Sequence, residues 1–180
     1  MGLTINKQQL ADLDKETFNG KIYVVDDLAE VDRAIAFLST KEALGFDTET
    51  KPAFKRGQVN NVALLQLATE DECFLFRLNK IGYPDVLEEL MSDKSIKKIG
   101  LSLRDDFAAL SKRTGEKPEN FIDLQLFVDK FGIEDNSLQK IYAIIFGKKI
   151  SKSQRLSNWE AVELSPAQQA YAAIDAWACL

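Results

Sequence analysis

The stretch from residue 61 to residue 78 constrains the fold more than any other part of the sequence. It holds two apolar, β-prone runs, NVALLQLAT (61–69) and ECFLFRL (72–78), with only a short polar turn between them. Such a pattern indicates a hairpin of two antiparallel strands. A third β-prone run, ALGFDTE (43–49), comes before a loop, TKPAFKRGQ (50–58), whose proline and glycine break regular structure. The sequence therefore predicts three strands in an antiparallel meander.

The rest of the chain alternates between short apolar runs and amphipathic segments. NFIDLQLF (120–127) fits a strand or a helix equally well. The last helix has the clearest start, with Ser165 as N-cap, Pro166 as its first residue and Gln168 completing a capping box. A meander followed by such alternation predicts an α/β domain with a mixed sheet. The remaining elements are expected as strands at 21–27 and 96–103 and helices at 28–40, 83–93, 104–115, 136–147 and 165–180.

The domain organisation is expected to be simple. A chain of 180 residues is long enough to bury one core. We expect a polar, helix-prone appendage at 1–20 and a single domain at 21–180. No C-cap signal lies between Asp175 and Leu180, so the terminal helix is expected to be cut short.

The composition excludes several kinds of chemistry. The chain has no histidine, which removes the commonest general base and the usual zinc ligand. Cys73 and Cys179 stand in apolar contexts without metal-ligand spacing, as expected for core residues in a reducing compartment. No apolar run approaches the roughly 20 residues of a membrane span, and no signal-peptide pattern is present, so we expect a cytoplasmic protein. The net charge of −5 argues against general adhesion to nucleic acid but not against a local basic patch.

Carboxylates follow apolar segments at several places. Asp47 and Glu49 are two residues apart, so they share one face of their strand. Asp106 follows an apolar strand at the start of a helix, and Tyr171 and Asp175 share a helix face. Asp175 has apolar neighbours, where a carboxylate is costly unless it is paired or bound to a metal. Oxygen ligands without histidine or cysteine suit Mg²⁺ or Mn²⁺.

Each of these residues has a simpler interpretation when it is taken alone. The strand-end acids fit a solvated position, Asp106 fits a helix first turn favoured by the macrodipole, and Tyr171 fits a core aromatic. Taken together and in order, the segments FDTE, GLSLRDDFAAL and SNWE…YAAIDAW resemble the DEDD 3′–5′ exonuclease superfamily over about residues 40–180. The most similar branch is the DEDDy group, which includes RNase D and the Werner-type exonuclease domain. The motif positions of the superfamily fall on Asp47 and Glu49, on Asp106 (framed by Gly100 and Leu110), and on Tyr171 and Asp175.

This resemblance implies an RNase H-like fold, a mixed five- to six-stranded β-sheet flanked by helices. It also implies two divalent metal ions, Mg²⁺ or Mn²⁺. Asp47 would bridge both ions, Glu49 and Asp175 would complete the shell of the first, and Asp106 would bind the second directly or through water. Tyr171 would orient or deprotonate a water. The implied reaction releases nucleoside 5′-monophosphates from a single-stranded 3′ end of DNA or RNA.

A basic segment gives an acidic protein a means of holding nucleic acid. Between residues 136 and 159 there are five basic residues and no acidic ones. With Lys55 and Arg56 they would cradle backbone phosphates, although an ordinary solvated loop fits equally well. Phe54 and Trp159 are candidates for stacking on bases, and for Trp159 a structural plug is the stronger alternative. The five basic residues are Lys140, Lys148, Lys149, Lys152 and Arg155.

Two other functions compete with an active exonuclease. One is a catalytically weak or inactive DEDD-fold module that binds nucleic acid or a partner. The other is a different RNase H-like enzyme such as an endonuclease, against which the Tyr-x-x-x-Asp helix argues. All four acids and the tyrosine are present, which favours the exonuclease. The sequence leaves the choice between DNA and RNA open, because phosphate clamping by metals does not depend on the sugar.

Overall fold

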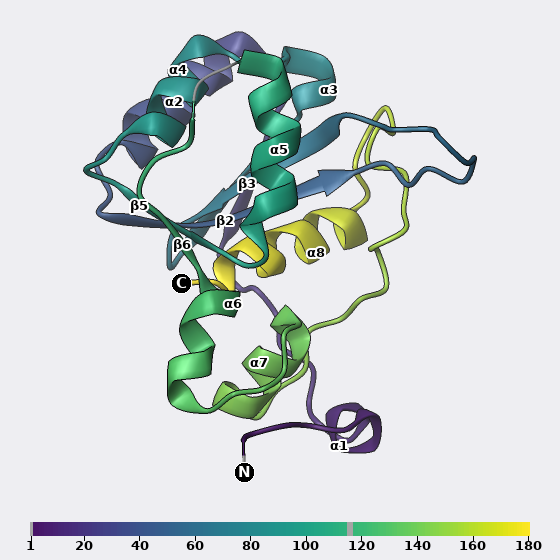
Figure 1. The fold of residues 1–180 in the computed structure, drawn as a ribbon. Helices are drawn as coiled ribbons and strands as arrows, with labels where there is room; N and C mark the ends of the chain where they lie inside the picture. Colours follow the sequence, from purple (N-terminus) through teal and green to yellow (C-terminus); the bar gives the residue numbers. More distant parts are fainter. Residues whose placement is uncertain (1, 115–116) are drawn as a thin grey trace.

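The computed structural model describes residues 2–114 and 117–180. Its centre is a six-stranded sheet in the order β1-β4-β3-β2-β5-β6 (Figure 1). Strands β2, β3 and β4 form the expected antiparallel meander, while β1 is parallel to β4, and β5 and β6 extend the sheet parallel to β2. The predicted mixed sheet is therefore confirmed. The strands are β1 (Lys21–Val25), β2 (Ala43–Thr50), β3 (Val62–Ala68), β4 (Glu72–Phe76), β5 (Lys97–Gly100) and β6 (Phe121–Asp123).

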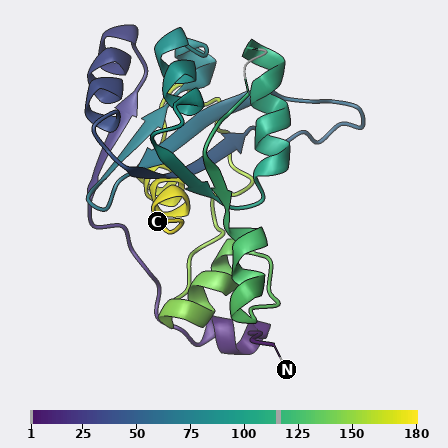
Figure 2. The same ribbon diagram turned by 60° about the vertical axis from the view of Figure 1, so that its left-hand side comes forward.

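Helices cover both faces of this sheet. The helices α2, α4 and α5 pack on one face around a core that includes Leu44, Phe46 and Leu65, whereas α8 packs on the opposite face (Figure 1). Helix α7 and the short α6 form a smaller group beside α8 and the end of β6 (Figure 2). The helices are α1 (Lys7–Ala11), α2 (Leu28–Leu38), α3 (Leu78–Ile81), α4 (Asp85–Ser92), α5 (Leu103–Thr114), α6 (Leu124–Phe127), α7 (Leu138–Phe146) and α8 (Pro166–Trp177), with a 3₁₀ turn, η1, at Val128–Phe131.

The strand expected at 96–103 is shorter than predicted. It ends at Gly100, because Ser102 has a φ of 58°, which turns the backbone out of the extended conformation. The carboxylate of Asp123 accepts hydrogen bonds from the backbone N–H groups of Ser102 and Leu103, at 2.9 and 3.0 Å, and so holds the corner where α5 begins. Gly115, expected to end this helix, lies outside the described residues.

The ambiguous segment 120–127 contains both of the elements considered for it. Its first part is β6 and its second part is α6, with Asp123 at the junction as the α6 N-cap. A polar side chain that caps a helix directly after an apolar strand explains why one periodicity could not describe the whole segment.

Strand β2 and helix α8 approach each other closely, and this spacing positions the site. A Cβ atom at Gly45 would overlap the backbone carbonyl of Ala176, so the contact requires a residue without a side chain there. On the neighbouring strand, the buried amide of Gln66 donates to the carbonyl of Ala172 at 3.4 Å. The predicted capping box and the proline at the start of α8 are both present. The acids on β2 and Asp175 on α8 are therefore held at a fixed separation.

The N-terminal residues lie along the α6–α7 group rather than along the sheet (Figure 2). Leu3 pairs with Ile133, and the ring of Phe18 packs 5.8 Å from that of Trp177. Both cysteines are free and buried, as expected. Across the two described ranges, no helix has the length and apolar character needed to cross a membrane.

Candidate active site

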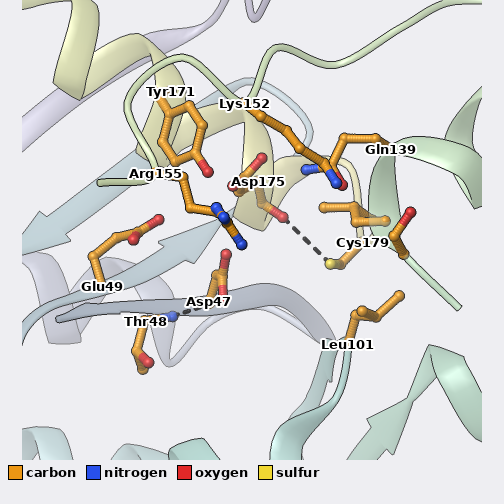
Figure 3. Close-up of a pocket in the computed structure, with 12 residues that line it drawn as sticks. Asp47, Thr48, Glu49, Leu101, Gln139, Lys152, Arg155, Tyr171, Asp175 and Cys179 are labelled. Carbon is orange, nitrogen blue, oxygen red and sulfur yellow. Dashed lines mark hydrogen bonds between the residues drawn. The ribbon is translucent and has the colours of Figure 1, made fainter. Parts of the chain in front are cut away.

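Three of the four predicted acids meet where β2 faces α8. Asp47 and Glu49 point from β2 toward α8, which contributes Asp175 and, one turn earlier, Tyr171 (Figure 3). Asp47, Glu49 and Asp175 each place one carboxylate oxygen within 4.8 Å of the others. Strand alternation and helical periodicity, which the sequence pattern indicated, bring these side chains to one point.

The electrostatics of this cluster favour a cation. Burial, followed by repulsion from Asp175 and Asp106, raises the pKa of Asp47 well above its usual value. Burial and the same neighbours, with Asp47 first, raise the pKa of Glu49 to about 10. Burial raises the pKa of Asp175 to about 7, and its Oδ1 atom is buried without a hydrogen-bond partner. An all-oxygen donor set with a buried, unpaired carboxylate oxygen fits Mg²⁺ or Mn²⁺.

Asp106 stands apart from the other three acids. It lies on α5, and its Oδ1 accepts a hydrogen bond from the hydroxyl of Thr48, which alternates away from Asp47 and Glu49 along β2. Burial raises the pKa of Asp106 to about 6, while the Thr48 hydrogen bond acts in the opposite direction. Its charge still contributes to the raised pKa values of Asp47 and Glu49. The predicted fourth ligand is therefore near the cluster but is engaged elsewhere.

The tyrosine and tryptophan of the C-terminal motif form a packed pair. Tyr171 is 6% exposed, and burial together with the nearby carboxylates raises the pKa of its hydroxyl, so the phenol stays neutral. The Trp159 ring lies 5.9 Å from that of Tyr171 and is 0% exposed. A fully buried indole offers no face to a base, so the stacking role for Trp159 is wrong and the structural plug is the correct alternative.

The cluster lines a pocket of about 290 Å³. The predicted basic residues Lys152 and Arg155 extend over it from the loop before Trp159, opposite the carboxylates (Figure 3). Positive side chains that face a carboxylate pocket are suited to a phosphate held between them and a metal ion.

The family model for 3′-5′ exonuclease matches residues 22–180. The chain belongs to this family. It is 35% identical over 149 residues to the bifunctional 3′-5′ exonuclease/ATP-dependent helicase WRN of Mus musculus, covering 79% of this chain and 11% of the relative. It is 29% identical over 136 residues to ribonuclease D of Desulfotalea psychrophila, covering 74% and 36%. The chain spans about a tenth to a quarter of the length of the first three curated relatives it matches.

Solved structures share this fold. RNase D of Escherichia coli superposes with a TM-score of 0.78 at 23% identity, over 87% of this chain and 42% of that one. The catalytic core of RRP6 from Trypanosoma brucei gives 0.79 at 18% identity, over 98% and 50%. These likenesses confirm the predicted RNase H-like fold, and with the family match they confirm the resemblance to DEDD exonucleases.

The other predicted nucleic-acid contacts of this exonuclease-family chain lie away from the pocket. Phe54, which is 84% exposed, and Arg56 lie in the loop between β2 and β3. The ammonium groups of three lysines already have partners within the protein. They are Lys140, 2.5 Å from Asp135; Lys148, 3.2 Å from Glu16; and Lys149, which donates to the carbonyl of Ala11.

Sequence reasoning missed part of the pocket wall. Helix α7 and the residue before it contribute Ser137, Leu138 and Gln139, and Cys179 lines the pocket from beyond α8. Gln139 carried one usable signal, because it is a polar residue one helical turn before the buried Tyr142. Ser137 carried no such signal, because a serine directly before a helix is normally interpreted as an N-cap and not as a pocket residue.

Proposed function

We propose that this chain is a metal-dependent 3′–5′ exonuclease. It hydrolyses phosphodiester bonds from the single-stranded 3′ end of DNA or RNA and releases nucleoside 5′-monophosphates. The observation that carries the proposal is the convergence of three carboxylate groups, each with one oxygen within 4.8 Å of the others; Asp47 and Glu49 are half-buried, and Asp175 is buried with one oxygen that has no partner among the described residues. Like charges so close together are unfavourable unless protons or cations lie between them.

The residues of the pocket have distinct roles in this proposal. Asp47, Glu49 and Asp175 would hold two Mg²⁺ or Mn²⁺ ions, which would supply positive charge to the scissile phosphate and lower the pKa of the attacking water. Tyr171 orients that water as a neutral phenol, because its raised pKa makes it a poor base. Arg155 and the neighbouring Lys152 bind phosphate oxygens from the opposite side of the pocket.

The position of Asp106 creates one demand on this mechanism. To serve as the fourth ligand, directly or through water, Asp106 would use the carboxylate oxygen that does not accept from Thr48, or would give up that hydrogen bond. This arrangement is also the one observation that favours the alternative, a catalytically weak or inactive module that binds nucleic acid or a protein partner.

The relatives support a nucleic-acid substrate, and only one of the two cited here names its sugar. One solved relative is RNase D of Trypanosoma brucei in complex with RNA U12, which has a TM-score of 0.78. Another relative is the exonuclease and helicase WRN, described above. Both DNA and RNA therefore belong in the first experiment.

That experiment uses single-stranded DNA and RNA oligonucleotides labelled at the 5′ end, each incubated with Mg²⁺, Mn²⁺ or EDTA. We expect a ladder that shortens from the 3′ end, disappears in EDTA and is absent in the Asp47→Asn variant. A substrate blocked at its 3′ end separates an exonuclease from an endonuclease, which would still cut it. Binding without metal-dependent shortening would support the binding module instead.

A further inference from the structure

The α7 wall of the pocket, defined here as Ser137 and Gln139, has unused hydrogen-bonding capacity. Gln139 is 9% exposed and lines the pocket, with its amide directed toward the interior (Figure 3). Among the described residues, its side chain has no hydrogen-bond partner. Ser137 precedes α7, but its hydroxyl makes no cap hydrogen bond. An amide that faces the pocket and makes no side-chain hydrogen bond within the described residues is available to a ligand.

The pocket has one charged half and one neutral half. The carboxylates, with Arg155 and Lys152, carry the charge of the pocket, and Lys152 extends toward Gln139 (Figure 3), whereas Leu101, Leu138 and Cys179 give apolar surface beside the α7 wall. A nucleotide is divided in the same way, with a charged phosphate bonded directly to a neutral sugar. The pocket has a volume of about 290 Å³. When a phosphate group lies at the carboxylates, the sugar bonded to it is the part of the nucleotide nearest to the neutral half.

The amide of Gln139 matches one group of that sugar. A carboxamide both donates and accepts hydrogen bonds, and a ribose 2′-hydroxyl does the same. A deoxyribose has neither function at this position, so it would leave the amide without this hydrogen bond.

We propose that Gln139, assisted by Ser137, binds the 2′-hydroxyl of the nucleotide beside the scissile phosphate and makes this chain prefer RNA. The proposal rests on the exonuclease function above and names the substrate class of the same pocket. Loss of one such buried hydrogen bond corresponds to a preference for RNA of about tenfold.

The test compares four oligonucleotides of one sequence: all-ribose, all-deoxyribose, and two RNAs with a single 2′-deoxy nucleotide at the last or the next-to-last position. We would measure kcat/KM for the wild-type protein, Gln139→Leu and Ser137→Ala. The control is Gln154→Leu, the same change in the loop that carries Lys152 and Arg155 but outside the pocket lining. Gln139→Leu is expected to lose about tenfold on RNA and almost nothing on DNA, which removes the preference. In the wild type, one of the two single 2′-deoxy substitutions should reproduce that loss.

A binding measurement keeps the inference separate from catalysis. Fluorescence anisotropy of labelled RNA and DNA, in an Asp47→Asn background that blocks cleavage, should show weaker RNA binding after Gln139→Leu and unchanged DNA binding. Equal losses on both sugars, or no change, would overturn the role of Gln139 while leaving the exonuclease intact. Failure of the exonuclease itself has a different signature, the absence of metal-dependent shortening on every substrate. In that case, the ratio of the RNA and DNA affinities measured by anisotropy decides whether Gln139 discriminates between ribose and deoxyribose.

Discussion

Two acidic clusters of this protein have the same composition and opposite properties. In each, three carboxylate groups place one oxygen within 4.8 Å of one another. The first is the active-site cluster of Asp47, Glu49 and Asp175. The second, which we call the surface cluster, consists of Asp26, Asp27 and Glu30 at the start of α2.

The difference lies in burial and in existing partners. All three residues of the surface cluster are exposed. Asp27 is the N-cap of α2 and accepts from the backbone N–H of Glu30 at 2.9 Å, and Asp26 pairs with Lys80 at 3.0 Å. Water and these partners already stabilise the surface carboxylates, whereas burial raises the pKa of each active-site acid. Asp47 does accept a hydrogen bond from the backbone N–H of Thr48 at 2.9 Å, so burial that raises the pKa, rather than the number of carboxylates, distinguishes the active-site cluster from the helix cap.

The largest expected difference between the clusters is in activity. Asp175→Asn removes a proposed metal ligand and should lower metal-dependent cleavage by at least about 100-fold. The matched change Asp26→Asn should leave cleavage within about twofold, because it alters only an exposed ion pair. Rates on a 5′-labelled oligonucleotide at saturating Mg²⁺ check both. Comparable losses in the two variants would mean that the comparison of the clusters is wrong.

The next effect concerns Tyr171. Tyr171→Phe keeps the packing against Trp159 but removes the hydroxyl, so turnover should fall by about 10- to 100-fold while metal binding is retained. Tyr142→Phe is the matched control, since Tyr142 is also 6% exposed but donates its hydroxyl to Glu16 at 2.9 Å. Single-turnover rates check the loss of turnover in Tyr171→Phe against Tyr142→Phe, and a Mn²⁺ titration checks that both variants still bind metal. A Tyr171→Phe enzyme as fast as the wild type would exclude the water-orienting role.

The third prediction concerns stability and pH in the absence of metal. Asp106 and Asp175 have folded pKa values raised to about 6 and about 7 from an ordinary 3.8, so the folded protein binds more protons than the unfolded chain. Stability must therefore fall as the pH rises above about 4 and continue to fall through pH 7. Melting temperatures in EDTA from pH 5 to pH 8 should show this decline, and Asp47→Asn should reduce it. Added Mg²⁺ should raise the melting temperature at pH 8. A melting temperature that stays constant or rises with pH would contradict the raised pKa values of these acids.

The smallest effect belongs to the surface cluster. Asp27→Ala removes the α2 N-cap and should lower the free energy of unfolding by about 1 kcal/mol in urea denaturation. The rate of cleavage and the response of the melting temperature to Mg²⁺ should not change. If Mg²⁺ stabilised the wild type less after this substitution, the surface cluster would be a metal site as well.

The sequence predicted elements well where one periodicity applied to a whole segment. The hairpin of β3 and β4 and the capped helix α8 followed from local pattern alone, because strand alternation and capping boxes are properties of neighbouring residues. The corner at Ser102 and the change from strand to helix at Asp123 were not predicted. The corner depends on hydrogen bonds between residues about 20 positions apart, which no local pattern records. The change at Asp123 depends on its local cap hydrogen bond from Gln125, but the apolar run around it hid the boundary.

The same distinction applies to the site. The order and spacing of the motifs identified Asp47, Glu49 and Asp175 before any coordinates, since each motif lies within one element. Only the tertiary structure decided which side chains are free to act. It buried Trp159, paired Lys148 with Glu16, turned Asp106 toward Thr48 and left Gln139 unpaired in the pocket. A residue's type and neighbours fix its chemistry, but whether it has a partner depends on distant segments that only the folded chain brings together.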